Sequence, residues 1–352
     1  MVIFIGPSRK PITGQALAFN LLADRYSGEK IIMYYQGSDM IRKVFSTFIT
    51  VAFLFYYLSC KKVVAVYLTT SRSTFGFLRD LSIISLANIF HCRVINHLHG
   101  ADFHDFYNDS SRLVKMLIKK AYRKIDTSIV LLPKMMSQYS KFPDMRIEVV
   151  SNCCDLEKLT IDFADKKKNK ILFLSNIMYS KGIFHLIEAV GYLVSQGRDI
   201  ELSIAGLPMA DEFCGIEEIK DKFEKAIQGK DYIRYHGIVE GDLKLHLLSE
   251  SYIFALPSFY KTEAQPISII EAMKSGCVIV CNDHNYLADI VGNENGALIT
   301  DELTKGLVEN IAKYLDDMAL GERVFNFNRV EAEVKYSPDL YLDKISRILN
   351  EV

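Results

Sequence analysis

The sequence has no low-complexity run, no internal repeat and no CxxC pair. Its seven cysteines are an odd number, with Cys153 and Cys154 adjacent and Cys277 and Cys281 four positions apart. This usage favours reduced thiols in a cytoplasmic protein. The N-terminus also lacks a basic region followed by an apolar run and a small-residue cleavage site, so no secretory signal peptide is expected.

A large net charge is also absent, but the formal value of −1 hides a division of the chain. Residues 1–150 carry 20 Lys and Arg against 10 Asp and Glu, a net of +10, while the remainder carries 22 against 33, a net of −11. The basic half is therefore expected to meet an anionic partner. No recognised nucleic-acid motif accompanies the charge, so a phospholipid surface or a phosphorylated acceptor fits better than nucleic acid.

The 352 residues suit two domains of ordinary size, each able to bury its own core. Short apolar strands alternate with helical patterns in both halves, which predicts two Rossmann-like α/β domains, 1–150 and 151–335. Residues 336–352 are expected to form a C-terminal helix that crosses back to the first domain. In the first strand–loop–helix unit, Gly14 is the candidate for close backbone approach to a donor, and an ordinary turn glycine is the alternative.

Two segments of the first half suggest a membrane surface. Residues 44–60 carry no charge and are flanked by basic pairs. They are short for a span and contain hydroxyl residues, so a buried or interface-lying helix is expected. Residues 111–125 form an amphipathic pattern, for which a merely solvated face is the alternative. Its basic stripe consists of Arg112, Lys115, Lys119, Lys120, Arg123 and Lys124, and its predicted apolar side of Leu113, Met116, Leu117, Ala121 and Ile125.

Two further stretches of the first half carry candidate binding groups. Arg79 could meet an acceptor phosphate, although an ion pair with Asp80 or another neighbour is an equal alternative. The strand 93–99 ends in HLHG, which places His97 and His99 on one face. The spacing to the following acids departs from the HxHxDH pattern of metallo-β-lactamase-like hydrolases. We therefore expect a structural role for His97, a functional role for His99, and no metal.

The stretch 257–280 holds the clearest site pattern. Glu263 and Glu271 stand eight positions apart around Pro266, in an otherwise nearly uncharged segment. Pro266 suits the first position of a helix, where the amides of residues 267–269 would form an anion site. A buried helix with two incidental acids is the alternative.

This segment resembles the Glu-x7-Glu motif of family 4 retaining glycosyltransferases, which have the GT-B fold. The resemblance implies that Glu263 contacts the donor sugar, that Glu271 binds the ribose, and that Gln265, Pro266 and Ile267 line the donor site. The family usually has Glu-Gly-Phe-Gly where this chain has Glu-Ala-Gln-Pro.

Two other turns extend the resemblance. The segment 175–182, SNIMYSKG, is similar to the family's Gly-Arg-x5-Lys-Gly, whose two cations bind the donor diphosphate. Lys181 is retained, whereas Asn176 stands at the arginine position. By the same resemblance, His236 lies where the family contacts the nucleotide base, and His99 lines the acceptor side.

The resemblance implies a two-domain GT-B enzyme, a retaining hexosyltransferase. The expected donor is a nucleotide sugar, UDP-sugar favoured, and no metal or cofactor is required. The expected acceptor is a glycan carried on polyprenyl diphosphate in bacterial surface polysaccharide synthesis. The protein is expected to be cytoplasmic and peripherally bound to the anionic inner face of the plasma membrane. A GT-B nucleotide-sugar epimerase and a catalytically silent partner of a polysaccharide-assembly complex remain alternatives.

Overall fold

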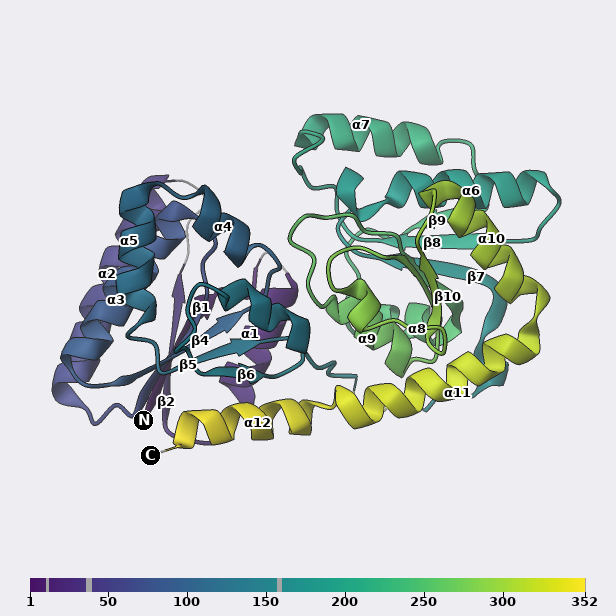
Figure 1. Cartoon of the computed structure of the whole chain (residues 1–352). Coiled ribbons are helices and arrows are strands. Elements are labelled where there is room, and N and C mark those ends of the chain that lie inside the picture. The colour runs from purple at the N-terminus through teal and green to yellow at the C-terminus, as the bar shows by residue number, and fades with distance from the viewer. Residues whose placement is uncertain (11–12, 36–39, 157–159, 352) are drawn as a thin grey trace. The chain divides into compact units, whose positions relative to one another are not determined.

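The computed structural model describes residues 1–10, 13–35, 40–156 and 160–351. The chain divides into two compact units (Figure 1), Met1–Cys153 with Pro338–Val352 (unit 1) and Cys154–Ser337 (unit 2). The sequence analysis placed the boundary after residue 150 and the start of the returning segment at residue 336. Two residues of the predicted first loop, 11 and 12, lie outside the described residues.

Unit 1 is built on a parallel six-stranded sheet with the order β2-β1-β3-β4-β5-β6. Its strands are β1 (Val2–Pro7), β2 (Lys30–Tyr35), β3 (Ala65–Thr69), β4 (Arg93–Leu98), β5 (Thr127–Val130) and β6 (Ile147–Val149). The central strands are nearly continuous apolar runs, because helices cover both faces of a parallel sheet. Phe4, for example, lies opposite Ile32 on one neighbouring strand and Tyr67 on the other.

Three helices of unit 1 begin at residues whose side chains cap them. Thr13, Ser73 and Ser111 each accept a backbone N–H of the first turn that follows. The helices of unit 1 are α1 (Gly14–Arg25), α2 (Met40–Cys60), α3 (Thr74–Ile89), α4 (Phe103–Asp109), α5 (Arg112–Tyr122), the 3-10 helix η1 (Pro133–Tyr139) and α12 (Pro338–Asn350).

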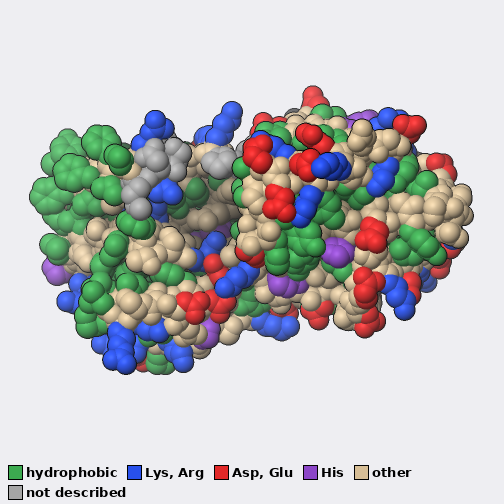
Figure 2. Space-filling model, turned by 90° about the horizontal axis from the view of Figure 1, so that it is seen from above, with side chains coloured by type: hydrophobic (Ala, Val, Ile, Leu, Met, Phe, Trp, Pro, Cys, Tyr) green, Lys and Arg blue, Asp and Glu red, His purple; other side chains and the backbone are tan. Residues whose placement is uncertain are grey.

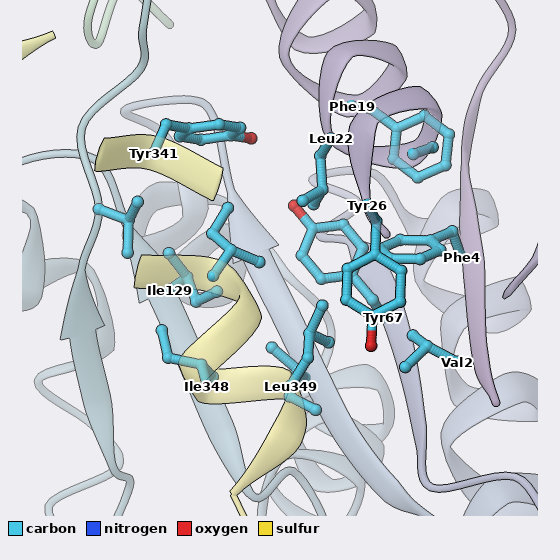
Figure 3. Close-up of a cluster of buried hydrophobic side chains, with 14 of the residues drawn as sticks. Val2, Phe4, Phe19, Leu22, Tyr26, Tyr67, Ile129, Tyr341, Ile348 and Leu349 are labelled. Carbon is cyan, nitrogen blue, oxygen red and sulfur yellow. The ribbon is translucent and has the colours of Figure 1, made fainter. Parts of the chain in front are cut away.

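The last helix of the chain belongs to the core of unit 1. Tyr341, Ile345, Ile348 and Leu349 of α12 are buried against side chains of the sheet and of α1, among them Phe4, Leu22 and Tyr67. Figure 3 shows this packing, with α12 in yellow and its side chains directed at those of the strands. Arg93 of β4 also donates to the carbonyls of Ile348 and Glu351 at the end of α12. The first unit is therefore completed by residues more than 180 positions away in the sequence.

Unit 2 has a second parallel six-stranded sheet, with the order β12-β11-β10-β7-β8-β9. Its strands are β7 (Lys167–Leu174), β8 (Glu201–Ala205), β9 (Ile233–Tyr235), β10 (Ser251–Leu256), β11 (Val278–Asn282) and β12 (Gly296–Ile299). The α-helices are α6 (Ile183–Ser195), α7 (Ile216–Ile227), α8 (Gly241–Glu250), α9 (Ile267–Lys274), α10 (Leu303–Asp316) and α11 (Met318–Lys335), and the 3-10 helices are η2 (Phe163–Asp165), η3 (Tyr179–Lys181) and η4 (Leu287–Asp289).

The two parallel sheets with their helices confirm the predicted α/β class. One local prediction needs correction, because Pro266 is the N-cap of α9 and not its first helical residue. Strand β7 begins within a lysine-rich segment, and its Lys170 is buried between Glu201 and Glu250. Gly6 of β1 packs closely on α1, since an added Cβ would lie 2.4 Å from the ring of Phe19.

Helix α2 is longer than the uncharged run that predicted it. Among the described residues it is the one helix of sufficient length and apolar composition to cross a membrane, over Ile41–Cys60. Only 17% of its apolar window is buried inside the protein. It is therefore not the buried core helix that the sequence left open, and its exposed side needs an explanation.

Candidate active site

The candidate site of unit 2 lies between β7 and β10, where the order in which the chain adds strands to the sheet reverses. From β7 the chain proceeds through β8 and β9 on one side, and from β10 through β11 and β12 on the other. In an open parallel sheet, the loops after two such strands diverge and leave a crevice at their carboxyl ends, where ligands bind. The loop after β7 carries Lys181, and the loop after β10 carries Glu263.

Lys181 and Glu263, which were predicted from separate motifs, meet at this position. The Lys181 Nζ lies 2.5 Å from the Glu263 Oε2, and the Ser258 hydroxyl donates to the same oxygen at 2.7 Å. Both charged side chains are about nine-tenths buried. The Lys181 Nζ also lies 4.9 Å from the centre of the Tyr260 ring, on the same β10 loop. A buried cation is thus held by a carboxylate and an aromatic face.

The backbone explains why glycine follows this lysine. Gly182 has φ of +74°, and an added Cβ would lie 2.1 Å from the carbonyl oxygen of Pro257. The amide of Phe259 donates to the carbonyl of Ser180 at 2.8 Å, which joins the two loops a second time. Asp211 accepts both the amide and the hydroxyl of Ser180 at 2.7 Å. Lys181 is therefore positioned by a loop with little freedom.

Helix α9 begins at the end of the loop that follows β10, as predicted, but its N-terminus has fewer free amides than the three that were expected. Ile269 donates to the carbonyl of Pro266 at 3.2 Å, so its amide is not available to an anion. For the amides of Ile267 and Ser268, no hydrogen-bond partner is found among the described residues. The anion site at this end of α9 therefore consists of two backbone donors rather than three.

Glu271 is buried in the middle of α9 and has a partner that the sequence did not reveal. The Nζ of Lys244, on α8, lies 2.5 Å from the Glu271 Oε1. Burial raises the pKa of Glu271, and the attraction of Lys244 opposes that rise. No spacing rule singles out Lys244 in the sequence, since it is the single lysine of a short helix outside the predicted motifs. It places a second cation beside Glu271.

The remaining donor candidates occupy the same edge of the sheet. Asn176 lies just after β7, where the β8 loop approaches so closely that a Cβ on Gly206 would lie 1.9 Å from the carbonyl oxygen of Ser175. Gln265 is buried beside Glu263. His236 follows β9, with its Nε2 at 3.2 Å from the hydroxyl of Ser203, and burial lowers its pKa.

In unit 1, the rings of His97 and His99 lie against each other, tilted by 33°, at the end of β4. Their ring centres are 4.1 Å apart, and the Tyr67 hydroxyl lies 2.6 Å from the His97 Nδ1. Burial lowers the pKa of His97 well below its ordinary value. Burial, together with the nearby Arg72 guanidinium, lowers the pKa of His99 to about 3. His99 is therefore a neutral imidazole at physiological pH, able to donate one hydrogen bond and accept another.

The arginine at this edge of the sheet is Arg72, and not Arg79. Arg72 precedes α3 and pairs with Asp102 at 2.5 Å, with its guanidinium over Gly100, where an added Cβ would lie 2.2 Å from it. Arg79 is buried, paired with Asp80 at 2.8 Å and stacked 3.6 Å from the Tyr35 ring centre. The structure therefore shows the ion pair between Arg79 and Asp80, which was the alternative to a phosphate contact. It leaves Arg79 poorly placed to meet an acceptor phosphate.

The other unit 1 candidates lie on the surface. Gly14 is the exposed first residue of α1. Arg112, Lys119 and Arg123 are exposed on and beside α5, whereas Lys115 is half-buried. The predicted apolar side is only partly correct, because Ile118, Ala121 and Tyr122 are buried while Leu113 and Met116 are exposed among the basic residues.

A search of the described residues finds no group of three His, Cys, Asp or Glu side chains that could hold a metal ion. All seven cysteines are free thiols, six of them buried and Cys60 exposed.

Comparison with known proteins agrees with this geometry. Residues 157–329 match the family described as Glycosyl transferases group 1. Among curated proteins, none matches the sequence of the chain. HepE of Anabaena in complex with UDP superimposes over 100% of both chains with a TM-score of 0.78 and 14% identity.

Two other solved structures give the same result. Sucrose-phosphate synthase from Thermosynechococcus elongatus aligns over 99% of this chain and 97% of its own, with a TM-score of 0.76 and 15% identity. TarM of S. aureus, in a structure with α-GlcNAc-glycerol and UDP, aligns over 86% of this chain and 59% of its own, with a TM-score of 0.65 and 20% identity. These likenesses confirm the predicted GT-B fold. Residues 157–329 thus match a glycosyl transferases group 1 model, within a chain that has the GT-B fold.

Proposed function

We propose that the enzyme is a retaining glycosyltransferase of the family 4 type that uses a UDP-sugar. The observation that carries this proposal is the meeting of Lys181 and Glu263 at the switch point of the unit 2 sheet, 2.5 Å apart. A cation suits the diphosphate leaving group, and an acid suits the hydroxyls of the transferred sugar. The choice of UDP is supported by structural relatives with bound UDP and UDP-glucose.

Each group has a part in the transfer. The bond between the sugar C1 and the β-phosphate oxygen breaks, and negative charge develops on that phosphate. Lys181 and the amides of Ile267 and Ser268 stabilise this charge. Glu271 accepts the ribose hydroxyls, and Glu263 holds the sugar. The acceptor hydroxyl forms the new bond on the face that the leaving group vacates, and its proton passes to the departing phosphate oxygen.

On unit 1 we assign His99 to the acceptor side of the sugar. Its lowered pKa keeps the ring uncharged, so it can orient a sugar hydroxyl without repelling a cationic transition state. Retention by front-face substitution needs no metal, because the phosphate charge is balanced by Lys181 and backbone donors. The reaction is therefore proposed to be metal-independent.

The proposed acceptor is a glycan on polyprenyl diphosphate, in bacterial surface polysaccharide synthesis at the inner face of the plasma membrane. The net charge of +10 over residues 1–150 supports an anionic acceptor and an anionic surface. Arg79 is buried within α3 and paired with Asp80, so Arg72, which is also paired with an acid but lies in the loop before α3 and is less buried, replaces it as the candidate for the acceptor diphosphate. The basic residues Arg112, Lys119 and Arg123 are exposed to meet lipid headgroups.

A catalytically silent partner in a polysaccharide-assembly complex is the second candidate. It is favoured by one observation, the amide of Asn176 where a second diphosphate cation is expected. Lys244 is a further cation in unit 2, but its contact is with Glu271.

Incubation with a panel of nucleotide sugars, with and without lipid-linked acceptors, separates these candidates. We expect release of UDP from one UDP-sugar, faster with acceptor, and a product of retained anomeric configuration by NMR. Binding of UDP without any turnover across the panel would instead support the silent partner. Release of an isomerised nucleotide sugar would identify an epimerase.

A further inference from the structure

Helix α2 has the reverse of the side-chain distribution found in a soluble helix. The side that packs on unit 1 is a narrow stripe that includes Thr50, Leu54 and Leu58. The side that faces away carries the large apolar residues. These exposed residues are Ile41, Val44, Phe45, Phe48, Ile49, Phe53, Phe55 and Tyr56. Water is a poor solvent for this surface, so another apolar phase is its natural neighbour.

The hydroxyl groups of α2 are compatible with such a phase. Thr47, Thr50 and Ser59 each donate to the carbonyl four residues earlier, at 2.8–2.9 Å. No water is then needed to satisfy their O–H groups.

The neighbouring helices extend the same surface. Helix α2 packs on α3, and α3 packs on α5. Phe75, Leu78 and Ile89 of α3 are exposed, as are Leu113 and Met116 of α5. Figure 2 shows hydrophobic side chains gathered at the left end of unit 1. We call this surface, formed by the exposed apolar residues of α2, α3 and α5, the apolar face.

The charges on these three helices are almost all positive. Their sequences contain a single acid, Asp80, which is buried in its ion pair with Arg79. Basic residues stand at both ends of α2, as Arg42, Lys43, Lys61 and Lys62, and on and beside α5. An apolar surface edged by cations complements the acyl chains and anionic headgroups of one bilayer leaflet.

We propose that α2 lies in the lipid–water interface of an anionic leaflet, with its exposed side among the acyl chains and the basic residues of α5 at the headgroups. The proposed function includes only electrostatic binding to a membrane surface, and this inference adds insertion of the apolar face into the lipid. It rests on the proposed function only for the identity of the membrane. A transmembrane span is disfavoured, because it would remove Leu54 and Leu58 from their buried positions on unit 1.

Vesicle flotation tests this inference. We expect the wild type to float with vesicles containing about 30% phosphatidylglycerol and to remain bound at about 1 M NaCl, where the Debye length is near 3 Å. The variant Phe45→Ser/Phe48→Ser/Phe53→Ser should partition about a hundredfold less onto the vesicles, both at low salt and at about 1 M NaCl. These side chains are more than half exposed, so the variant should fold normally.

Two matched variants complete the design. Val330→Ser/Val334→Ser removes equally exposed apolar side chains from α11 of unit 2 and should leave flotation unchanged. Lys119→Glu/Lys120→Glu/Arg123→Glu should weaken binding at low salt and have little effect at high salt. A fluorophore on Cys60, the exposed cysteine at the end of α2, should shift to shorter wavelength on vesicle binding.

Several outcomes would overturn the inference. Wild-type protein that washes off the vesicles at high salt would show a purely electrostatic association. A lipid-free dimer that the triple serine variant abolishes, without vesicle binding, would make a second copy the occupant of the apolar face. Flotation and sugar transfer are read separately, so failure of the proposed activity leaves this test intact.

Discussion

The contact between Lys181 and Glu263 predicts an unusual effect on nucleotide binding. A phosphate that bonds the same ammonium would lie about 5 Å from the Glu263 carboxylate. At an effective dielectric constant of about 20, two unit charges at that distance repel by about 3 kcal/mol. Replacing Glu263 with Gln removes this repulsion and keeps the size of the side chain. After allowance for solvent screening, UDP should bind about 1–2 kcal/mol more tightly, which is roughly 5- to 30-fold in Kd.

The same substitution should lower activity. Glu263→Gln weakens the hold on the sugar, so turnover should fall by about 10²- to 10³-fold while UDP binding improves. Isothermal titration calorimetry with UDP and a steady-state assay with the UDP-sugar measure the two effects. Ser258→Ala is the matched control, because it removes a hydrogen bond to the same carboxylate oxygen and keeps the charge. Its UDP affinity should stay within about threefold of the wild type.

A clear result would refute this reasoning. If Glu263→Gln binds UDP more weakly than the wild type, Glu263 is part of the nucleotide site and does not compete for Lys181. If Lys181→Met also leaves the UDP affinity unchanged, the phosphate is held elsewhere.

Three further predictions follow from the site. Glu271→Ala should weaken UDP binding by about 3 kcal/mol, from the loss of charged hydrogen bonds to the ribose, and unchanged affinity by calorimetry would remove Glu271 from that role. Activity should survive EDTA in full, and stoichiometric zinc in the purified protein would contradict metal independence. His97 and His99 bind protons less readily when folded, so stability present above about pH 6.5 should be lost as the pH falls below that value, at up to about 1.4 kcal/mol per pH unit and histidine, and for His99 down to a pH of about 3. Urea unfolding at pH 7 and pH 5 should therefore show a smaller pH effect for His99→Asn than for the wild type.

The placement of Lys181 and Glu263 could be predicted because it depends on local rules. Lys181 precedes a glycine whose left-handed conformation the turn requires, and Glu263 stands just before a proline that caps a helix. Such turn and cap signals survive in sequence because the backbone geometry fixes them. Lys244 could not be found in this way. Its contact with Glu271 arises from the packing of α8 near α9, and no spacing along the chain encodes that distance.

The choice between two arginines shows the same limit. Arg72 and Arg79 both lie in the segment 71–80, and the sequence analysis named only Arg79, for either a phosphate contact or an ion pair with Asp80. The position of each arginine depends on where α3 begins. Because Ser73 caps the helix, Arg72 remains in the loop at the sheet edge, while Arg79 lies inside the helix beside Asp80 and under Tyr35. A shift of a few residues in a helix start would have exchanged their roles.

The burial of α12 in the core of unit 1 bears on the order in which the protein can fold during synthesis. Domains usually fold from the N-terminus as the chain emerges. Here the first 153 residues emerge early but lack Tyr341, Ile345, Ile348 and Leu349. Unit 2, which is one continuous stretch, has all of its residues sooner. The domain that is made first is therefore completed last, and until then its sheet keeps an open apolar surface where α12 will pack.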